Sequence, residues 1–199
     1  MNLYWYGQNS VGIDSGENSL VVSSLDLEKE LKPASSAGKS ARGADVVLVS
    51  QLQEVKVPSK TNSFLINNPG EYDVKGFFVM GLGGFGENIA YTIEVEGVRL
   101  CHLAGLDKEL TDAQLENFSD IDILLIDIGS TDDSNETASK IVNQIEPRIV
   151  IPIGYDDSKK ASVFFKEMGA SDVEPQNKLN IKKKDLPQEE TKTLLLNVV

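Results

Sequence analysis

The amino-acid sequence predicts an α/β protein in which two β-sheets share one core and helices lie outside them. Two observations lead to this prediction. In the first half of the 199-residue chain, short apolar or alternating segments are joined by turns, which is typical of strands. In the second half, strands alternate with helices. Because no linker rich in Pro, Gly or Ser separates the halves, we expect one domain over residues 1–199.

The strands of the first half follow from alternation, β-branched runs and turn residues. Residues 44–50 contain an unbroken apolar and mostly β-branched run, Val46 to Val49, which predicts a buried strand. Glu96 and Gly97 predict the turn of a hairpin. Besides 44–50, the expected strands cover 3–7, 11–14, 20–24, 63–66, 72–80, 89–94 and 98–103.

The helices of the second half carry start and stop signals. Thr111 and Gln114 form a capping-box pattern that opens a helix to about Phe118. Apolar residues from Ala138 to Ile145 recur at helical spacing, and a third helix over 159–168 ends near Gly169. The expected strands between and after these helices cover 121–128, 148–153, 179–183 and 191–199.

Composition excludes several classes of function. The net charge of −12 opposes binding to nucleic acids and to anionic membranes. No segment approaches the length of about 20 apolar residues that crosses a bilayer, so we expect no membrane association and a cytoplasmic location. A single cysteine, Cys101, agrees with a reducing compartment.

Two glycine motifs fit phosphate-binding patterns in the wrong context. Residues 81–86 read G-x-G-x-x-G, but β-rich sequence follows where a dinucleotide site needs a helix, so we expect a loop or bend. Asp107 would be the matching ribose partner. Gly38, Lys39 and Ser40 resemble the end of a phosphate-binding loop, but Pro33 stands at its first glycine.

The chain has one histidine, and this count limits its chemistry. His102 follows Cys101 on an expected strand, so the two side chains point to opposite faces and do not form a nucleophile–base pair. We expect His102 to be structural. A zinc site of His and Cys needs three or four such ligands, and this chain has only Cys101 and His102. The sequence therefore excludes a zinc site of this kind. A hard cation on Asp120, Asp122, Asp127, Asp132 and Asp133 stays open, beside an interpretation as acidic surface.

Several segments in order resemble a known family. They read NPGEYDVKG at 68–76, GVRLCHL at 97–103, DIDILLI at 120–126 and IEPRIVIP at 145–152. This pattern is similar to the small Zn-dependent hydrolase-like branch of the metallo-β-lactamase superfamily, close to L-ascorbate-6-phosphate lactonase. The resemblance implies a four-layer αββα sandwich. It also implies a centre of two Zn or Mn ions in the family.

The chain departs from the family at the metal ligands. Where the family has H-x-H-x-D-H, this sequence has Gln51, Gln53, Val55 and Lys56. The family's bridging Asp corresponds to Gly105, the His of Pro-Met-His-Tyr to Gly154, and the family's Gly-His-Ser to residues 7–9, with Gln8 in place of the His. Residues 81–87 also lack a His. Since amides bind metals poorly and Lys56 adds a positive charge, we expect no metal and no cofactor.

Two functions follow from this departure. In the first, the protein is a pseudoenzyme that acts as a binding, regulatory or assembly protein. Its partner is an unidentified small molecule or protein, or further copies of the chain as a homo-oligomer. The old cleft would be lined by Gln8, Gln51, Gln53, Val55, Lys56, Gly105 and Gly154. In the second, it is a hydrolase of small polar or anionic substrates with altered or no metal, which uses His102, Asp127, Lys56 and Glu54.

Overall fold

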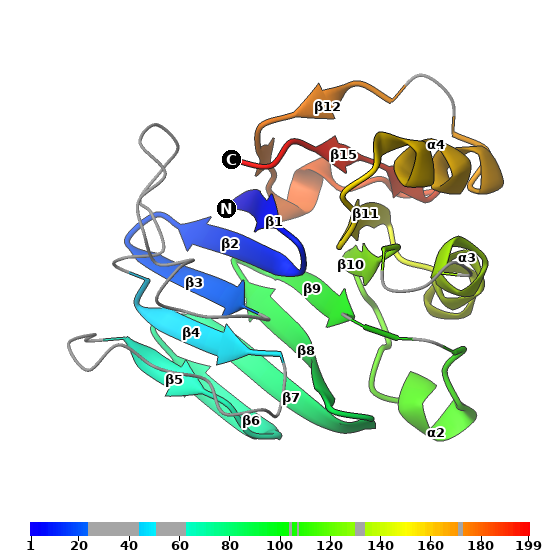
Figure 1. Ribbon diagram of the computed structural model, residues 1–199. Coiled ribbons are helices and arrows are strands. Elements are labelled where there is room, and N and C mark those ends of the chain that lie inside the picture. The colour runs from blue at the N-terminus through cyan, green and yellow to red at the C-terminus, as the bar shows by residue number, and fades with distance from the viewer. Residues whose placement is uncertain (24–43, 51–62, 104, 107, 130–133, 171–172) are drawn as a thin grey trace.

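The computed structural model describes residues 1–23, 44–50, 63–103, 105–106, 108–129, 134–170 and 173–199. In these ranges, two mixed β-sheets pack face to face, and the α-helices cover the outer face of the second sheet (Figure 1). The prediction of two sheets that share a core, with helices outside, is therefore confirmed.

The first sheet has the strand order β13-β1-β2-β3-β4-β5. The neighbours β13-β1-β2-β3 are antiparallel, whereas β3, β4 and β5 run parallel. The strands are β1 (Asn2–Gly7), β2 (Ser10–Ser15), β3 (Asn18–Ser23), β4 (Val46–Val49), β5 (Phe64–Ile66) and β13 (Leu179–Asn180).

The second sheet has the order β14-β11-β10-β9-β8-β7-β6. The hairpins of β6 to β9 are antiparallel, and β9, β10, β11 and β14 are parallel. The strands are β6 (Gly70–Val74), β7 (Phe77–Phe85), β8 (Asn88–Val95), β9 (Val98–Leu103), β10 (Ile123–Asp127), β11 (Ile149–Ile153) and β14 (Lys192–Thr193). A separate parallel pair joins β12 (Pro175–Gln176) to β15 (Leu195–Leu196).

Strand β10 shows why the second half carries unbroken apolar runs. Ile123 and Leu125 belong to the cluster between the two sheets. Leu124 and Ile126 belong to the cluster under the helices. Because apolar clusters cover both faces of the strand, residues 123–126 are all apolar and do not alternate with polar residues.

The three α-helices of the described residues begin and end near the predicted signals. In α2 (Asp112–Leu115), Thr111 and Gln114 form the capping box. Helix α3 (Ser134–Ile145) buries Ala138, Ile141, Val142 and Ile145 on the sheet. Helix α4 (Ser158–Glu167) is followed by Gly169, whose φ of 66° suits a residue after a helix C-cap.

Four predicted elements differ in the structure. Residues 72–80 are not one strand, because Lys75 (φ 55°) and Gly76 (φ 79°) form a turn between β6 and β7. The glycines of 81–86 mostly lie within β7, which bulges between Leu82 and Phe85, so they are not a separate loop. Residues 179–183 and 191–199 contain only short strands, and the 3-10 turn η2 (Lys183–Asp185) follows β13.

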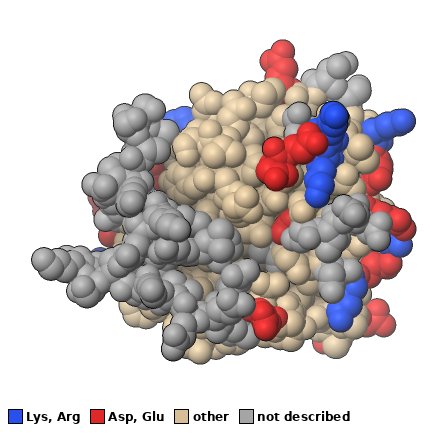
Figure 2. Space-filling model, in the orientation of Figure 1, with Lys and Arg blue, Asp and Glu red and all other residues tan. Residues whose placement is uncertain are grey.

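Charged side chains of both signs lie on the face of the molecule that Figure 2 displays. Figure 2 shows blue and red side chains interspersed on one side of the displayed face rather than gathered by sign. None of the described helices has the length and apolar character to cross a bilayer.

A polar cluster at the carboxyl edge as the candidate functional site

The carboxyl ends of β9, β10 and β11 meet at one edge of the second sheet. The register sets Ile126 beside Leu103 and Asp127 beside Ile153. The turn between β1 and β2 reaches this edge from the first sheet, since Gly154 N–H donates to Gln8 O at 2.9 Å. We call Gln8, Asn9, His102, Gly105, Asp127 and Gly154 the carboxyl-edge cluster. In α/β proteins such an edge is where ligands commonly bind.

Asp127 is the charged member of this cluster. Its Oδ2 accepts hydrogen bonds from Asn9 Nδ2 at 2.8 Å and from Gly105 N–H at 3.2 Å. Its Oδ1 accepts a hydrogen bond from Gly129 N–H at 2.7 Å. Because three neutral donors hold a buried carboxylate, both of its oxygens are already engaged within the protein.

Gly154 lies in a cradle formed by two other members of the cluster. Its φ is 79°, a conformation that favours glycine. A Cβ atom built here would lie 2.7 Å from Asn9 Oδ1 and closer still to the Asp127 carboxylate. The space into which a side chain would extend from this position is therefore filled by Asn9 and Asp127.

Gln8 contributes its backbone rather than its side chain. Its carbonyl accepts hydrogen bonds from Trp5 Nε1 at 2.8 Å and from the Gly154 N–H. The Trp5 ring packs on Tyr155, with 4.8 Å between centroids. The Gln8 side chain is exposed, so the residue fixes the turn against β11 and does not point into the cluster.

His102 lies fully buried beneath the turn between β1 and β2. Its Nε2 donates to the Asn9 carbonyl at 2.8 Å, because a carbonyl oxygen can only accept. Its Nδ1, like Asn9 Oδ1, has no hydrogen-bond partner among the described residues. Burial lowers the pKa of His102 from 6.5 to about 4, although Asn9 and Asp127 act in the opposite direction. Cys101 faces the helices instead.

His102 makes stability depend on pH. The folded protein has the lower pKa, so the unfolded chain binds more protons between about pH 6.5 and 4. We expect the free energy of unfolding to fall by about 2 kcal/mol from pH 7 to pH 5 from this group. Urea titrations across this range measure the change. Because the chain has one histidine, NMR of its imidazole should give a pKa near 4. A value near 6.5 in the folded protein would contradict the buried neutral state.

Gly105 closes the cluster on the side of β8. Its N–H bonds to Asp127, and its carbonyl accepts Asn88 Nδ2 at 3.3 Å. Its φ is 67°, and a Cβ here would lie 2.7 Å from Asn88 Nδ2. Position 105 therefore has no room for a side chain unless Asn88 moves.

Several predicted site residues lie outside the described residues. These are Gln51, Gln53, Glu54, Val55 and Lys56, together with Asp107, Asp132 and Asp133 and the 38–40 motif. Ser50, which follows β4 and precedes Gln51, lies beside the start of β8, because its carbonyl accepts the Ile89 N–H at 2.8 Å. The convergence of Lys56 and Glu54 with His102 and Asp127 stays a prediction.

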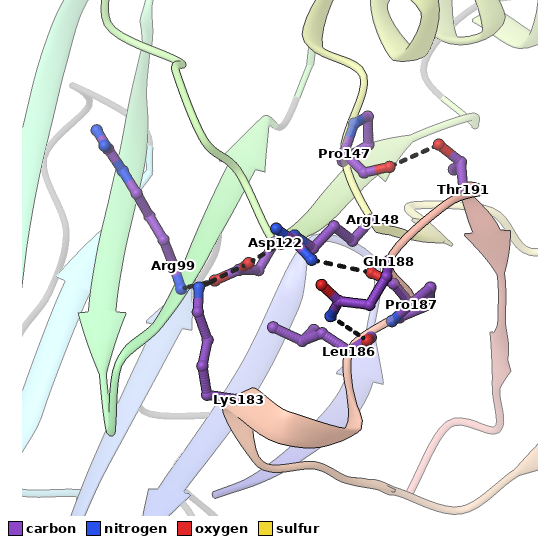
Figure 3. A network of polar contacts seen from close by, with 9 residues as sticks. All are labelled: Arg99, Asp122, Pro147, Arg148, Lys183, Leu186, Pro187, Gln188 and Thr191. Atoms are coloured by element: carbon purple, nitrogen blue, oxygen red, sulfur yellow. Dashed lines mark hydrogen bonds and ion pairs between the residues drawn. The ribbon is translucent and has the colours of Figure 1, made fainter.

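Asp122 does not join Asp127 in an acidic group. It precedes β10, whereas Asp127 ends that strand. Figure 3 shows the Asp122 carboxylate among cations and an N–H group instead: Lys183 Nζ lies 2.7 Å away, Arg148 Nε 3.3 Å away and the Arg99 N–H 2.8 Å away. Asp122 is 2% exposed, so the interpretation as acidic surface is wrong for this residue. Lys183, whose side chain is 54% exposed, is its ion-pair partner.

The described part of the cluster does not fit the two-metal centre that the fold family implies. Gly105 and Gly154 have no side chains to donate, and the Asp127 oxygens are held by N–H groups. His102 uses Nε2 for Asn9. In the part of the chain that the structure describes, no three His, Cys, Asp or Glu side chains gather at metal-binding distance.

Two mixed sheets with flanking helices and a polar cluster at this edge define a metallo-β-lactamase fold. The chain belongs to the β-lactamase superfamily: residues 2–154 match the family described as Beta-lactamase superfamily domain. The resemblance to this superfamily and the predicted fold class are thus confirmed.

Solved structures give the same fold. A candidate Zn-dependent hydrolase of the metallo-β-lactamase superfamily from Thermotoga maritima matches with a TM-score of 0.78 and 26% identity over 98% of each chain. A candidate metal-dependent hydrolase from Parabacteroides distasonis matches at TM-score 0.59 and 15% identity, over 85% of this chain and 90% of that one. The metallo-β-lactamase fold protein YhfI from Bacillus subtilis matches at 0.61 and 10%, over 85% and 94%. No curated protein matches the chain.

Asn9 is the residue of the cluster that sequence reasoning missed. It bonds Asp127 through its side chain and His102 through its carbonyl, and it fills the space beside Gly154. One signal was present: where the resemblance implies Gly-His-Ser, this sequence has Gly7, Gln8 and Asn9, so a longer amide side chain stands at the position of the family's serine.

Proposed function

We propose that the protein is a pseudoenzyme of the small Zn-dependent hydrolase-like branch, which binds a partner or ligand without performing metal-dependent hydrolysis. The substitutions Gln51, Gln53, Val55 and Lys56 support this proposal at the sequence level, because they remove metal ligands and add a cation. Without a metal, there is no bound water of lowered pKa to attack a substrate.

The filled space at Gly154 is the observation that carries the proposal. An enzyme that had lost a ligand but kept an open centre would leave a polar hollow beside the vacated position. Here Asn9 and Asp127 occupy that space, and Asn9 joins β10 to β9 through hydrogen bonds to Asp127 and His102. This network ties the two sheets together at the edge where metal ions would otherwise do so.

Metal analysis tests the proposal directly. We expect the protein, loaded with excess zinc or manganese and then dialysed, to retain well below one equivalent by elemental analysis. We also expect hydrolysis of a chromogenic phosphodiester and of a lactone to stay at the level of buffer with either metal added. Stoichiometric retention of zinc together with metal-dependent turnover would overturn the proposal.

A restored site with a matched control tests the role of Asn9. One variant would carry Gln51→His, Gln53→His, Val55→Asp, Lys56→His, Gly105→Asp and Gly154→His, and the second would add Asn9→Ser. If Asn9 blocks the centre, only the second variant should gain zinc in the same assay, because serine removes the amide that, together with Asp127, fills the space beside position 154. Equal zinc content in both variants would show that Asn9 is not the obstacle.

A further inference from the structure

The outer face of the second sheet carries an exposed aromatic side chain on β7, near the sheet edge that β6 forms (Figure 1, bottom). On the inner face of β7, Phe77 and Val79 belong to the core between the two sheets. Phe78, which lies between them in the chain, therefore points to the outer face, and its side chain is 43% exposed. It joins none of the hydrophobic clusters of the described residues. The helices that cover this sheet elsewhere thus leave the Phe78 ring accessible.

Carboxylates lie on both sides of the Phe78 ring. The register places Asp73 of β6 and Glu94 of β8 directly opposite Phe78, where the Cβ atoms of cross-strand neighbours are about 5 Å apart. Both side chains are exposed, and neither has an ion pair or a side-chain hydrogen bond among the described residues. An aromatic ring between two such carboxylates favours a planar cation, because cation–π attraction and charge-assisted hydrogen bonds act on the same group.

The nearby cations of the chain do not occupy this position. Arg99 lies opposite Glu94 on β9, but its guanidinium group donates to the Asn117 carbonyl at 3.4 Å. Lys75 lies in the turn between β6 and β7 and forms no ion pair with another described residue. With Glu71, the other exposed acid of β6 on this face, three carboxylates stand against these two cations. The face is therefore negative, and it complements a cationic partner.

Strand β6 also offers backbone groups to a partner. It is the last strand of its sheet. Its two-residue turn pairs Val74 with Phe77, and hydrogen-bonded pairs alternate with non-bonded pairs along such a hairpin. The N–H and C=O groups of Glu71 and Asp73 therefore point away from β7, and no other described residue bonds them. An open edge of this kind accepts a strand from another chain.

We propose that the edge of β6 and the adjoining face dock an extended, arginine-containing segment of a partner protein. The segment adds to β6 as a strand, and one arginine crosses β6 to place its guanidinium group over Phe78, between Asp73 and Glu94. Strands are about 4.8 Å apart, a step that the long arginine side chain covers. A second copy of the chain is a poorer occupant, since two β6 strands would bring Glu71 and Asp73 against the same carboxylates. The inference names a partner class for the binding protein proposed above and uses no residue of the carboxyl-edge cluster.

A peptide as long as β6 tests strand addition, and acetyl-Thr-Arg-Val-Arg-Thr-amide is a suitable probe. With ¹⁵N-labelled protein, we expect the peptide to shift the amide signals of Glu71, Asp73 and Phe78. The N–H groups of Glu71 and Asp73 should also exchange more slowly with solvent, because they gain hydrogen-bond partners. A peptide with citrulline in place of both arginines keeps the shape but lacks the charge, so it should bind about tenfold more weakly.

Two pairs of variants complete the test. Phe78→Leu keeps an apolar side chain but removes the ring, so binding of the arginine peptide should weaken about threefold. Phe64→Leu is its control, because Phe64 lies on β5 of the other sheet and is 47% exposed, and it should leave binding unchanged. Asp73→Asn combined with Glu94→Gln should weaken binding about tenfold. Glu174→Gln, an exposed carboxyl that precedes β12, should have no effect.

Several results would overturn the inference. These are equal affinity for the arginine and citrulline peptides, equal binding by the Phe78→Leu and Phe64→Leu variants, and amide shifts spread over the acidic surface rather than β6 and β7. Slow exchange of the Glu71 and Asp73 amides in the concentrated protein alone would show that a second copy takes the edge, and it would also overturn the inference. Zinc retention and turnover with unchanged peptide binding would overturn only the proposed function, so the two fail separately.

Discussion

Gly154→Ala should lower the free energy of unfolding by about 4 kcal/mol, as the sum of backbone strain and overpacking. The first part arises because alanine disfavours a φ of 79°. The second arises because the new methyl group would meet Asn9 and the Asp127 carboxylate. Urea denaturation, monitored by circular dichroism, measures the change through the midpoint at constant slope.

Gly169→Ala is the matched control for this substitution. Gly169 has a similar φ of 66°, but a Cβ there meets no atom within 4 Å. The control should therefore lose only the backbone part, about 1 kcal/mol. If both variants lost the same stability, the cluster would not be packed around Gly154, and the principal support for a filled centre would be gone.

Asp122→Leu should cost about 3–4 kcal/mol, because it removes the acceptor that a buried network shares. Lys183 and the Arg99 N–H would lose their partner just before β10, and Arg148 would keep its bond to the Pro187 carbonyl at 3.0 Å. The effect stays below the upper end of the range for buried ion pairs, since Lys183 is 54% exposed and Arg148 40% exposed. Both cations can therefore regain water.

Asp120→Asn provides the control, because Asp120 is an exposed carboxyl in the same segment. Its φ is 56°, and asparagine tolerates this conformation, so stability should change by less than about 0.5 kcal/mol. Denaturation of both variants in low and high salt adds a second readout. An Asp122→Leu variant as stable as the Asp120→Asn control would show that the network contributes little to the fold.

The strands and helices were readable because their signals are local. Apolar runs such as β10, the stripe of α3 and the capping box of Thr111 depend on residues within a few positions of one another. Breaks in strands were less readable. The turn at Lys75 and Gly76 has a lysine at positive φ, and the bulge in β7 depends on pairing with β8.

The sequence indicates the candidate site only through the ligand positions that the resemblance implies. It shows that these positions hold Gln, Val, Lys or Gly, but not which side chains lie around them. Asn9 lies 118 positions before Asp127 and 93 before His102, so no local pattern connects them. Asp122 and Lys183 are 61 positions apart, and their ion pair was likewise invisible.

By itself, the sequence determined the two-sheet fold, the superfamily and the presence of a single histidine on the face of its strand opposite to Cys101, since hydrophobic periodicity and residue identity are properties of the chain alone. Only the tertiary structure decided that Asn9 and Asp127 close around Gly154 and that Asp122 lies buried between cations. The physical reason is that burial and hydrogen-bond partners arise where separate strands meet. The edge at which β9, β10 and β11 end exists only after the sheets have formed.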